Sequence, residues 1–191
     1  EVLAPGVWGI VPDNKRQDQI KDYYKESVKY GSGLNAQSEK LFDHYMYREV
    51  AFTQRCIVPV TGFFEPHHYE KKSYPYYIHR EDDDAFALAG IYTVIDTFIT
   101  FSILTRAASP LIAQIHNKRK REPVMLPAAL EHSWLDAELS QADVMEHVNT
   151  PYLYDELETY TVSKDVHNHR VDSNVATITE RIDYPELQRL F

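Results

Sequence analysis

Cysteine is almost absent from this sequence of 191 residues, since Cys56 is the single one. One thiol cannot form a disulfide within the chain, so the composition favours a reducing compartment. No apolar run is long enough to span a bilayer, and the start of the chain lacks the basic region, apolar stretch and cleavage site of a signal peptide. We therefore expect a cytoplasmic protein without membrane contact.

Positive charge is scarce as well. The chain has 20 Lys and Arg residues against 29 Asp and Glu residues, which gives a formal net charge of -9 at pH 7. This balance works against general adhesion to polyanions such as nucleic acids. A nucleic-acid partner would therefore have to bind a locally basic surface.

Several motifs of common enzymes are missing too. The sequence has no P-loop, no Gly-x-Gly-x-x-Gly and no Gly-x-Ser-x-Gly, which removes the common nucleotide-binding and serine-hydrolase interpretations. His67 and His68 are adjacent and would point to opposite faces of a strand, so they lack the spacing of metal ligands. Cys56 lies in an apolar run, where an inert buried thiol is expected rather than a nucleophile. The sequence thus predicts no metal and no cofactor.

Apolar and aromatic residues, by contrast, are plentiful. A hydrophobic content of 43%, with 14 Tyr, 8 Phe and 2 Trp, is ample for one core, and we expect residues 1–191 to form a single domain. Short apolar bursts separated by turn residues predict strands over 55–60, 74–79, 85–92, 97–104 and 159–162. The charged stretch between the second and third of these is typical of a hairpin turn, and the fourth is apolar enough to be a central strand.

An amphipathic helix is predicted over residues 38–48, because Leu41, Phe42 and Tyr45 would lie on one face. Further helices are expected over 127–135 and 140–148, whereas 15–30 is either a surface helix or a long insertion. Together with the strands, these segments predict a strand-rich α+β fold.

A short helix is predicted to begin at Ser109, an N-cap residue, followed by Pro110, which suits the first helical position. His116 ends this helix, just before the basic run 118–121. Histidine is ordinarily a solvent-facing or hydrogen-bonded residue, but its unperturbed pKa of about 6.5 also suits a general acid or base. The basic run is either a solvated loop or, beside an active-site histidine, a phosphate-binding segment.

Two more polar residues have both a structural and a functional interpretation. Asn35 precedes the predicted helix over 38–48, where it is a cap or turn residue unless it has a role in a site. Glu65 follows Gly62-Phe-Phe at a predicted strand end, where it is either an exposed turn residue or a partly buried one. Burial would raise the pKa of its carboxyl and suit it to proton transfer near neutral pH.

Six short pieces of sequence follow one another in a distinctive order. They are Trp8-Gly-Ile-Val-Pro12, Leu34-Asn-Ala-Gln-Ser-Glu39, Arg55-Cys-Ile-Val-Pro59 with Gly62-Phe-Phe-Glu65, Phe86-Ala-Leu-Ala-Gly90, Ser102-Ile-Leu-Thr105, and Ile115-His116 with Pro123-Val-Met-Leu126. In this order they resemble the SRAP family, the SOS response-associated peptidase domains that sense abasic sites in single-stranded DNA. The resemblance covers Val7 to about Leu126, and the stretch 162–168 is similar to the family's closing segment.

This resemblance implies a chemistry and a set of site residues. In the family, the cysteine exposed by removal of the initiator Met captures the aldehyde of a ring-opened abasic sugar, giving a Schiff base and then a thiazolidine crosslink. By resemblance, Glu65 shuttles protons and assists self-removal of the Met, His116 acts as acid and base at the sugar, and Asn35 orients the cysteine. DNA contacts are implied for Trp8, Gln37, Thr105, Lys118, Arg119 and Arg121.

The resemblance also implies a fold and a partner. The expected fold is a curved or barrel-like mixed sheet flanked by short helices. The expected partner is single-stranded DNA with abasic sites, bound by a monomer. The family's catalytic cysteine is not in this sequence, which has no initiator Met, so we expect an upstream segment that carries it.

Three residues depart from the family pattern. Gln37 replaces the usual Arg and removes a charge that could contact phosphate. Pro66 stands where a Trp that would stack on DNA is usual, and Glu122 stands where Met is usual. A noncatalytic nucleic-acid or protein-binding module on the same fold therefore remains an alternative. A peptidase that acts on other proteins is disfavoured, since neither a metal site nor a catalytic triad is recognisable.

Overall fold

The structure is a computed structural model that describes residues 2–168 and 170–187. The chain forms two compact units, and each is described by itself. Unit 1 contains the described residues of Glu1–Pro59, Ala87–Arg106 and Pro123–Tyr152, and unit 2 contains those of Val60–Phe86, Ala107–Glu122 and Leu153–Phe191. Strands and short helices occur in both units, which confirms the α+β class, while the single SRAP-like domain over 1–191 stays a prediction.

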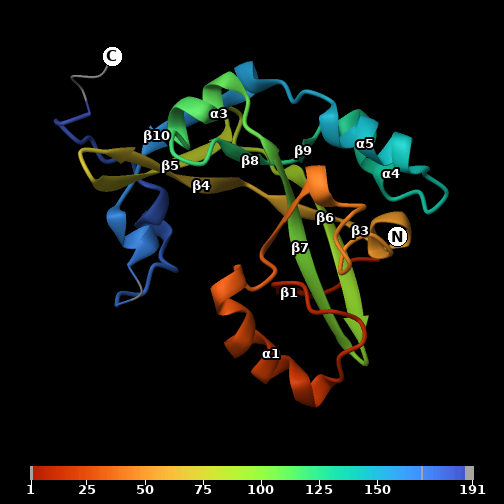
Figure 1. The fold of residues 1–191 in the computed structure, drawn as a ribbon. Helices are drawn as coiled ribbons and strands as arrows, with labels where there is room; N and C mark the ends of the chain where they lie inside the picture. Colours follow the sequence, from red (N-terminus) through yellow and green to blue (C-terminus); the bar gives the residue numbers. More distant parts are fainter. Residues whose placement is uncertain (1, 169, 188–191) are drawn as a thin grey trace. The chain divides into compact units, whose positions relative to one another are not determined.

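The sheet of unit 1 is built around β7 (Phe98–Ala107). On one side β7 pairs antiparallel with β6 (Phe86–Ile95), and on the other it pairs parallel with β1 (Val7–Trp8) (Figure 1). It also pairs parallel with β2 (Asn35–Gln37). Two further strands, β3 (Arg55–Val60) and β9 (Met125–Leu126), pair with β6. The prediction that the strand over 97–104 is central is therefore confirmed.

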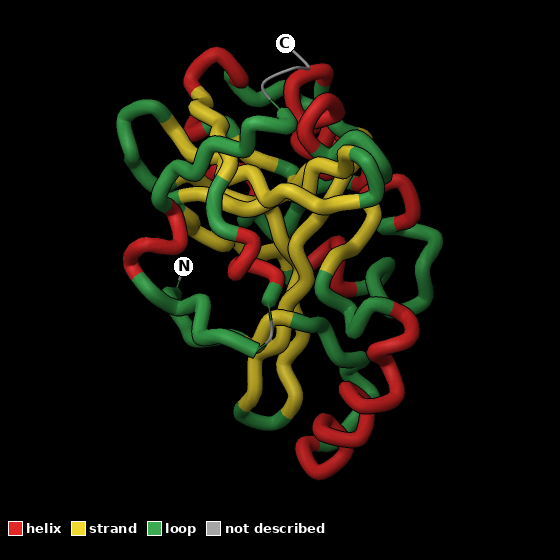
Figure 2. Tube along the Cα trace, turned by 90° about the vertical axis from the view of Figure 1, so that its left-hand side faces the viewer, coloured by secondary structure: helices red, strands yellow, loops and turns green. Residues whose placement is uncertain are grey.

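Short helices complete unit 1; Figure 2 draws the helices of the whole chain in red and the strands in yellow. They are η1 (Gln17–Gln19), α1 (Ile20–Ser27), η2 (Val28–Tyr30), η3 (Ser38–Lys40), α2 (Val50–Thr53), α4 (Ala128–Trp134) and α5 (Gln141–Asn149). The predicted helices over 127–135 and 140–148 are confirmed, and 15–30 is helical rather than an insertion. Ser140 caps α5 because its hydroxyl accepts from the backbone N–H of Asp143.

The amphipathic helix predicted over 38–48 is wrong. After the single turn of η3, the backbone runs through a series of turns, and Tyr45, expected on the apolar face, is 70% exposed. Asp, His and Tyr in this stretch have low helix propensity. In addition, the backbone N–H of Met46 donates to Nδ1 of His44, 3.3 Å away, a side-chain bond that competes with helical pairing.

The core of unit 1 forms around Trp134, which is fully buried and donates from its indole Nε1 to the carbonyl of Cys56 (3.0 Å). Arg55 is buried beside it and donates to the carbonyls of Trp134 and Ala51 (2.8 and 2.7 Å). These helix carbonyls carry partial negative charge and so compensate the buried guanidinium. The other buried members of this core are Ile10, Ala36, Leu41, Tyr47, Val50, Ala51, Ala87, Ala89, Ile91, Leu104, Val124, Leu126, Val144 and Val148.

Unit 2 contains a sheet of three antiparallel strands in the order β10 (Leu157–Thr161), β5 (Lys72–Arg80), β4 (Gly62–Tyr69). Strands β4 and β5 form a hairpin whose turn residues Glu70 and Lys71 have positive φ. The predicted hairpin between the second and third strands is therefore wrong: β5 pairs with β4, a strand that the sequence reasoning missed. Within the described residues neither sheet closes into a barrel.

Helix α3 (Pro110–Ile115) of unit 2 begins as the sequence predicts, with Ser109 as its N-cap and Pro110 at the first position. Glu122 reinforces this start: it is 1% exposed, and its Oε2 accepts from the backbone N–H of Ser109 (2.9 Å) while its Oε1 accepts from the hydroxyl of Tyr154 (2.6 Å). The glutamate in place of the family's Met thus has a structural role. Further elements of the chain are β8 (Arg121–Pro123), η4 (Tyr154–Glu156), η5 (Lys164–His167) and η6 (Ala176–Thr179).

None of the helices in the described ranges combines the length and the apolar character needed to cross a membrane.

Candidate active site

Glu65 and His116 lie against each other in unit 2. Nδ1 of His116 is 3.0 Å from Oε2 of Glu65, and the two side chains are 11% and 16% exposed. Glu65 lies within β4 rather than at a strand end, and it is largely buried, so its interpretation as an exposed turn residue is wrong. His116 follows the last residue of α3, as expected. The structure therefore brings together two of the three predicted catalytic residues.

Burial shifts the pKa values of these two groups in opposite directions. Desolvation raises the pKa of the Glu65 carboxyl from 4.5 to about 7. It lowers the pKa of the His116 imidazole, against a hydrogen bond to the Arg121 carbonyl that raises it. Since burial disfavours the charged form of each group, the structure favours a neutral carboxyl beside a neutral imidazole more than water would.

The contacts of His116 also select a tautomer. Its Nδ1 is 2.9 Å from the carbonyl oxygen of Arg121, and a carbonyl oxygen can only accept a hydrogen bond. Nδ1 therefore carries a hydrogen, which the ionised Glu65 carboxylate can share. In the neutral imidazole this leaves Nε2 as the unprotonated nitrogen, available to accept a proton.

Two neighbouring side chains hold this arrangement in place. Nδ1 of His67 lies 3.1 Å and 3.2 Å from the carbonyls of Gln114 and Ile115, at the end of α3, where helix carbonyls lack partners. Asn117 accepts from the backbone N–H of His68 (3.0 Å) and donates to its carbonyl (2.8 Å). The segment that carries His116 is thus fixed to the edge strand β4 on both sides of the imidazole.

The basic run forms a tight turn directly after the pair. The backbone N–H of Lys120 donates to the carbonyl of His116 (2.8 Å), and Lys120 has a φ of 51°. Lys118 and Arg119, at the tip of this turn, are exposed, whereas Arg121 is half-buried. Four cationic side chains, with that of the exposed Lys120, therefore lie within a few residues of the candidate acid and base.

The remaining predicted residues lie in unit 1, in one row along β7. Trp8 pairs with Phe101, Asn35 with Ile103 and Gln37 with Thr105. Because residues two apart on a strand share a face, Trp8, Asn35, Gln37 and Thr105 lie on the same face of this sheet. Trp8 is 50% exposed, and its Nε1 donates to the carbonyl of Leu34 (2.7 Å). Asn35 is an exposed residue of β2 rather than a helix cap, and its part in catalysis stays a prediction.

Sequence reasoning missed the roles of Asn117, His67 and the main chain of His68. Asn117 follows His116 directly, but nothing in its local sequence indicates that its amide pairs with a distant strand. Cys56 agrees with its expected inertness, since burial raises the pKa of its thiol to about 12. Among the residues described, no three His, Cys, Asp or Glu side chains form a group suited to a metal ion.

Comparison with known sequences identifies relatives of this chain. The family model for SOS response associated peptidase (SRAP) matches residues 1–169. The abasic site processing proteins YoqW and YobE of Bacillus subtilis are 28% and 29% identical over 172 and 167 residues, which cover 87% and 84% of this chain and 71% of each relative. An abasic site processing protein of Saccharomyces cerevisiae is 29% identical over 83% of this chain and 42% of its own length.

Solved structures of other proteins have a fold similar to that of this chain. A protein from Bacteroides thetaiotaomicron aligns with a TM-score of 0.78 at 30% identity, over 92% of this chain and 75% of its own. A protein from Bordetella bronchiseptica aligns with a TM-score of 0.68 at 25% identity, over 84% of this chain and 77% of its own.

Proposed function

Because the chain belongs to the SOS response-associated peptidase (SRAP) family, we propose that it captures abasic sites in single-stranded DNA covalently, through a cysteine upstream of the present sequence. The observation that carries the proposal is the 3.0 Å contact between Glu65 and His116, with the pKa of the carboxyl raised to about 7. The relatives YoqW and YobE are abasic site processing proteins, which supports the choice of substrate. Amine addition to an aldehyde needs proton transfers to and from the reacting groups, and a carboxyl with a pKa raised to about 7 suits them.

The reaction forms two bonds at the aldehyde carbon and releases one water. The α-amine of the cysteine attacks the aldehyde to give a carbinolamine, which loses water to form a Schiff base. The thiol then adds to the imine carbon, and the imine nitrogen takes up the proton that sulfur loses, which gives the thiazolidine. Glu65 accepts a proton from the attacking amine and returns one to the departing hydroxyl. His116 serves as acid and base at the oxygen of the sugar. Asn35 orients the cysteine.

Binding of the DNA backbone is assigned to the basic turn after His116. The exposed cations Lys118 and Arg119 provide the local positive charge that a chain with a net charge of -9 otherwise lacks. Arg121 adds to it, and Trp8, Gln37 and Thr105 provide the uncharged contacts. Self-removal of the initiator Met, also assisted by Glu65, exposes the amine that reacts.

The test mixes the full-length protein with a single-stranded oligonucleotide that contains one abasic site. A gel-shifted species that survives denaturation is expected. The Glu65→Gln and His116→Ala variants should form it roughly 100-fold more slowly or worse, the usual contribution of a general acid or base. The intact mass of each protein shows whether the Met has been removed. If protein that has lost the Met forms no denaturation-resistant species, the proposal is overturned.

A noncatalytic module on the same fold is the alternative, favoured by the loss of charge at Gln37. It predicts binding that is reversible, sensitive to salt and unchanged in the Glu65→Gln and His116→Ala variants. The same oligonucleotide, measured under native conditions, distinguishes the two functions.

A further inference from the structure

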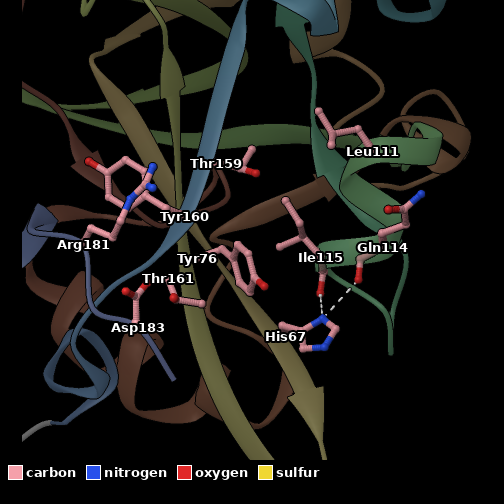
Figure 3. Close-up of a pocket in the computed structure, with 10 residues that line it drawn as sticks. All are labelled: His67, Tyr76, Leu111, Gln114, Ile115, Thr159, Tyr160, Thr161, Arg181 and Asp183. Atoms are coloured by element: carbon pink, nitrogen blue, oxygen red, sulfur yellow. Dashed lines mark hydrogen bonds between the residues drawn. The ribbon is translucent and has the colours of Figure 1, made fainter. Parts of the chain in front are cut away.

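A cavity of about 370 Å³ opens on unit 2 (Figure 3). It is lined by residues of β4, β5, α3, β10 and the segment 181–183. Its volume is within the range of small-molecule sites. None of its lining residues takes part in a proton transfer of the proposed reaction, although His67 also helps to hold α3 against β4. The cavity is therefore a candidate binding site for a further ligand.

The cavity adjoins the Glu65–His116 pair. In the sheet of unit 2, Glu65 pairs with Tyr76, and Tyr76 pairs in turn with Thr161. Partners in neighbouring strands point to the same face, so Glu65 shares its face with the lining residues Tyr76 and Thr161, of which Tyr76 is one strand spacing away, at roughly 5 Å. The lining residue Ile115 directly precedes His116, so the cavity and the pair also share α3. A sugar held at the pair would have its neighbouring nucleotide beside the cavity.

The walls of the cavity are aromatic or apolar at depth and polar at the entrance. His67 and Ile115 are buried, at 8% and 5% exposure, and the rings of His67 and Tyr76 pack edge to face, with centroids 5.7 Å apart. Gln114 and Asp183 are exposed. Figure 3 shows Tyr76 between the α3 residues on one side and the 181–183 segment on the other. Such walls suit a flat ring that enters with a polar edge outward.

The charges at the entrance exclude a phosphate as the preferred ligand. Arg181 forms a salt bridge of 2.7 Å with Glu158, and its guanidinium stacks on the ring of Tyr160 at 4.7 Å. The carboxylate of Asp183 adds a negative charge at the same entrance. An uncharged group with hydrogen-bond donors fits this balance, since carboxylates accept from exocyclic amino groups such as N4 of cytosine.

We propose that this cavity receives the nucleobase of a nucleotide next to the abasic site, and that it favours bases with an exocyclic amino group. The inference depends on the proposed function, because it takes the abasic sugar to lie at Glu65 and His116. Tyr76 packs against the base, and Asp183 and Gln114 contact its polar edge.

The experiment measures reversible binding, so that it does not require crosslinking. The oligonucleotides contain a stable tetrahydrofuran analogue of the abasic site and carry cytosine, uracil or a baseless spacer at the neighbouring position, on the 5′ or the 3′ side. On one side, the full-length protein should bind the cytosine oligonucleotide roughly tenfold more tightly than the spacer, the order of magnitude of one stacked base. It should bind the uracil oligonucleotide with intermediate affinity.

Two variants test whether the cavity causes these differences in affinity. Tyr76→Ala should reduce the difference between cytosine and spacer to less than twofold, and Asp183→Asn should abolish the preference for cytosine over uracil. Both variants should bind the oligonucleotide with spacers on both sides as the unaltered protein does, which controls for folding. Equal affinity for base and spacer on both sides, or a difference that persists in both variants, would overturn the inference. Loss of the proposed function appears separately, as failure to crosslink any natural abasic oligonucleotide.

Discussion

The side-chain amide of Asn117 forms two hydrogen bonds with the main chain of His68, at 3.0 Å and 2.8 Å, and so extends the edge of β4 as a strand would. An edge strand offers unpaired N–H and C=O groups, and a carboxamide matches them because it carries both a donor and an acceptor. Since Asn117 follows His116 directly, these bonds help to fix the imidazole against Glu65.

Replacement of Asn117 by Ala should therefore affect both stability and chemistry. Two hydrogen bonds of ordinary strength are lost, so the free energy of unfolding should fall by roughly 1 to 3 kcal/mol. Crosslinking should slow by about tenfold or more, because a small misplacement of a reacting group has a large effect on rate. The exposed Asn14, replaced by Ala, serves as the matched control. An unchanged pH dependence of the crosslinking rate in the Asn117 variant would mean that the residue does not position His116.

The raised pKa of Glu65 predicts a pH-dependent stability. Below pH 4.5 the carboxyl is protonated in the folded and the unfolded chain, and its pKa shift has no effect. Between pH 4.5 and about 7 the unfolded chain loses a proton that the folded chain keeps, so the free energy of unfolding falls as the pH rises. The loss is complete about one pH unit above the folded pKa and is on the order of 3 kcal/mol.

Comparison with Glu65→Gln isolates this contribution, because the variant cannot titrate at this position. In urea unfolding, the variant should gain stability relative to the unaltered protein as the pH rises from 4.5 to 8, and the difference should be constant above that range. The lowered pKa of His116 has the opposite effect, destabilising the folded state at acid pH, but it is present in both proteins. A difference between the two proteins that does not change with pH would contradict the raised pKa.

Removal of the basic turn should weaken DNA binding without altering its sequence preference. In the double variant Lys118→Ala, Arg119→Ala, each lost phosphate contact should reduce the slope of log affinity against log salt by about 0.7 for single strands. Replacement of Lys71 in the β4–β5 turn and of Lys72, the first residue of β5, by Ala removes the same charge elsewhere in unit 2. Equal effects of the two double variants would show that only overall charge matters.

The affinity for single-stranded DNA should rise when Gln37 is replaced by Arg. Gln37 is exposed on β2, in the row with Trp8 and Thr105, so an added guanidinium can contact phosphate without displacing buried groups. Binding should become several-fold tighter at low salt, and the slope of log affinity against log salt should become steeper by about 0.7. Gln17→Arg adds the same charge at an exposed position of η1. If both substitutions have the same effect, the row along β7 is not a DNA contact.

Much of the local structure could be predicted because its causes are local. The Ser109–Pro110 start of α3 follows from a hydroxyl acceptor and a fixed φ, and the N-cap of α5 has the same origin at Ser140. The apolar run over 97–104 predicts a central strand, and β7 is one. The helix predicted over 38–48 failed where apolar spacing competed with poor helix formers and a side-chain bond from His44.

The sequence by itself determined the fold class, the family and the identity of Glu65 and His116 as candidates, because short motifs and apolar periodicity act over a few residues. Only the tertiary structure decided that Glu65 lies within β4, that its carboxyl is buried against His116, and that Asn117 and His67 fix α3 to that strand. These facts depend on strand pairing and on desolvation between segments far apart in the chain. Neither effect is encoded in the residues next to Glu65, since burial and its consequence for a pKa arise only once the distant segments pack together.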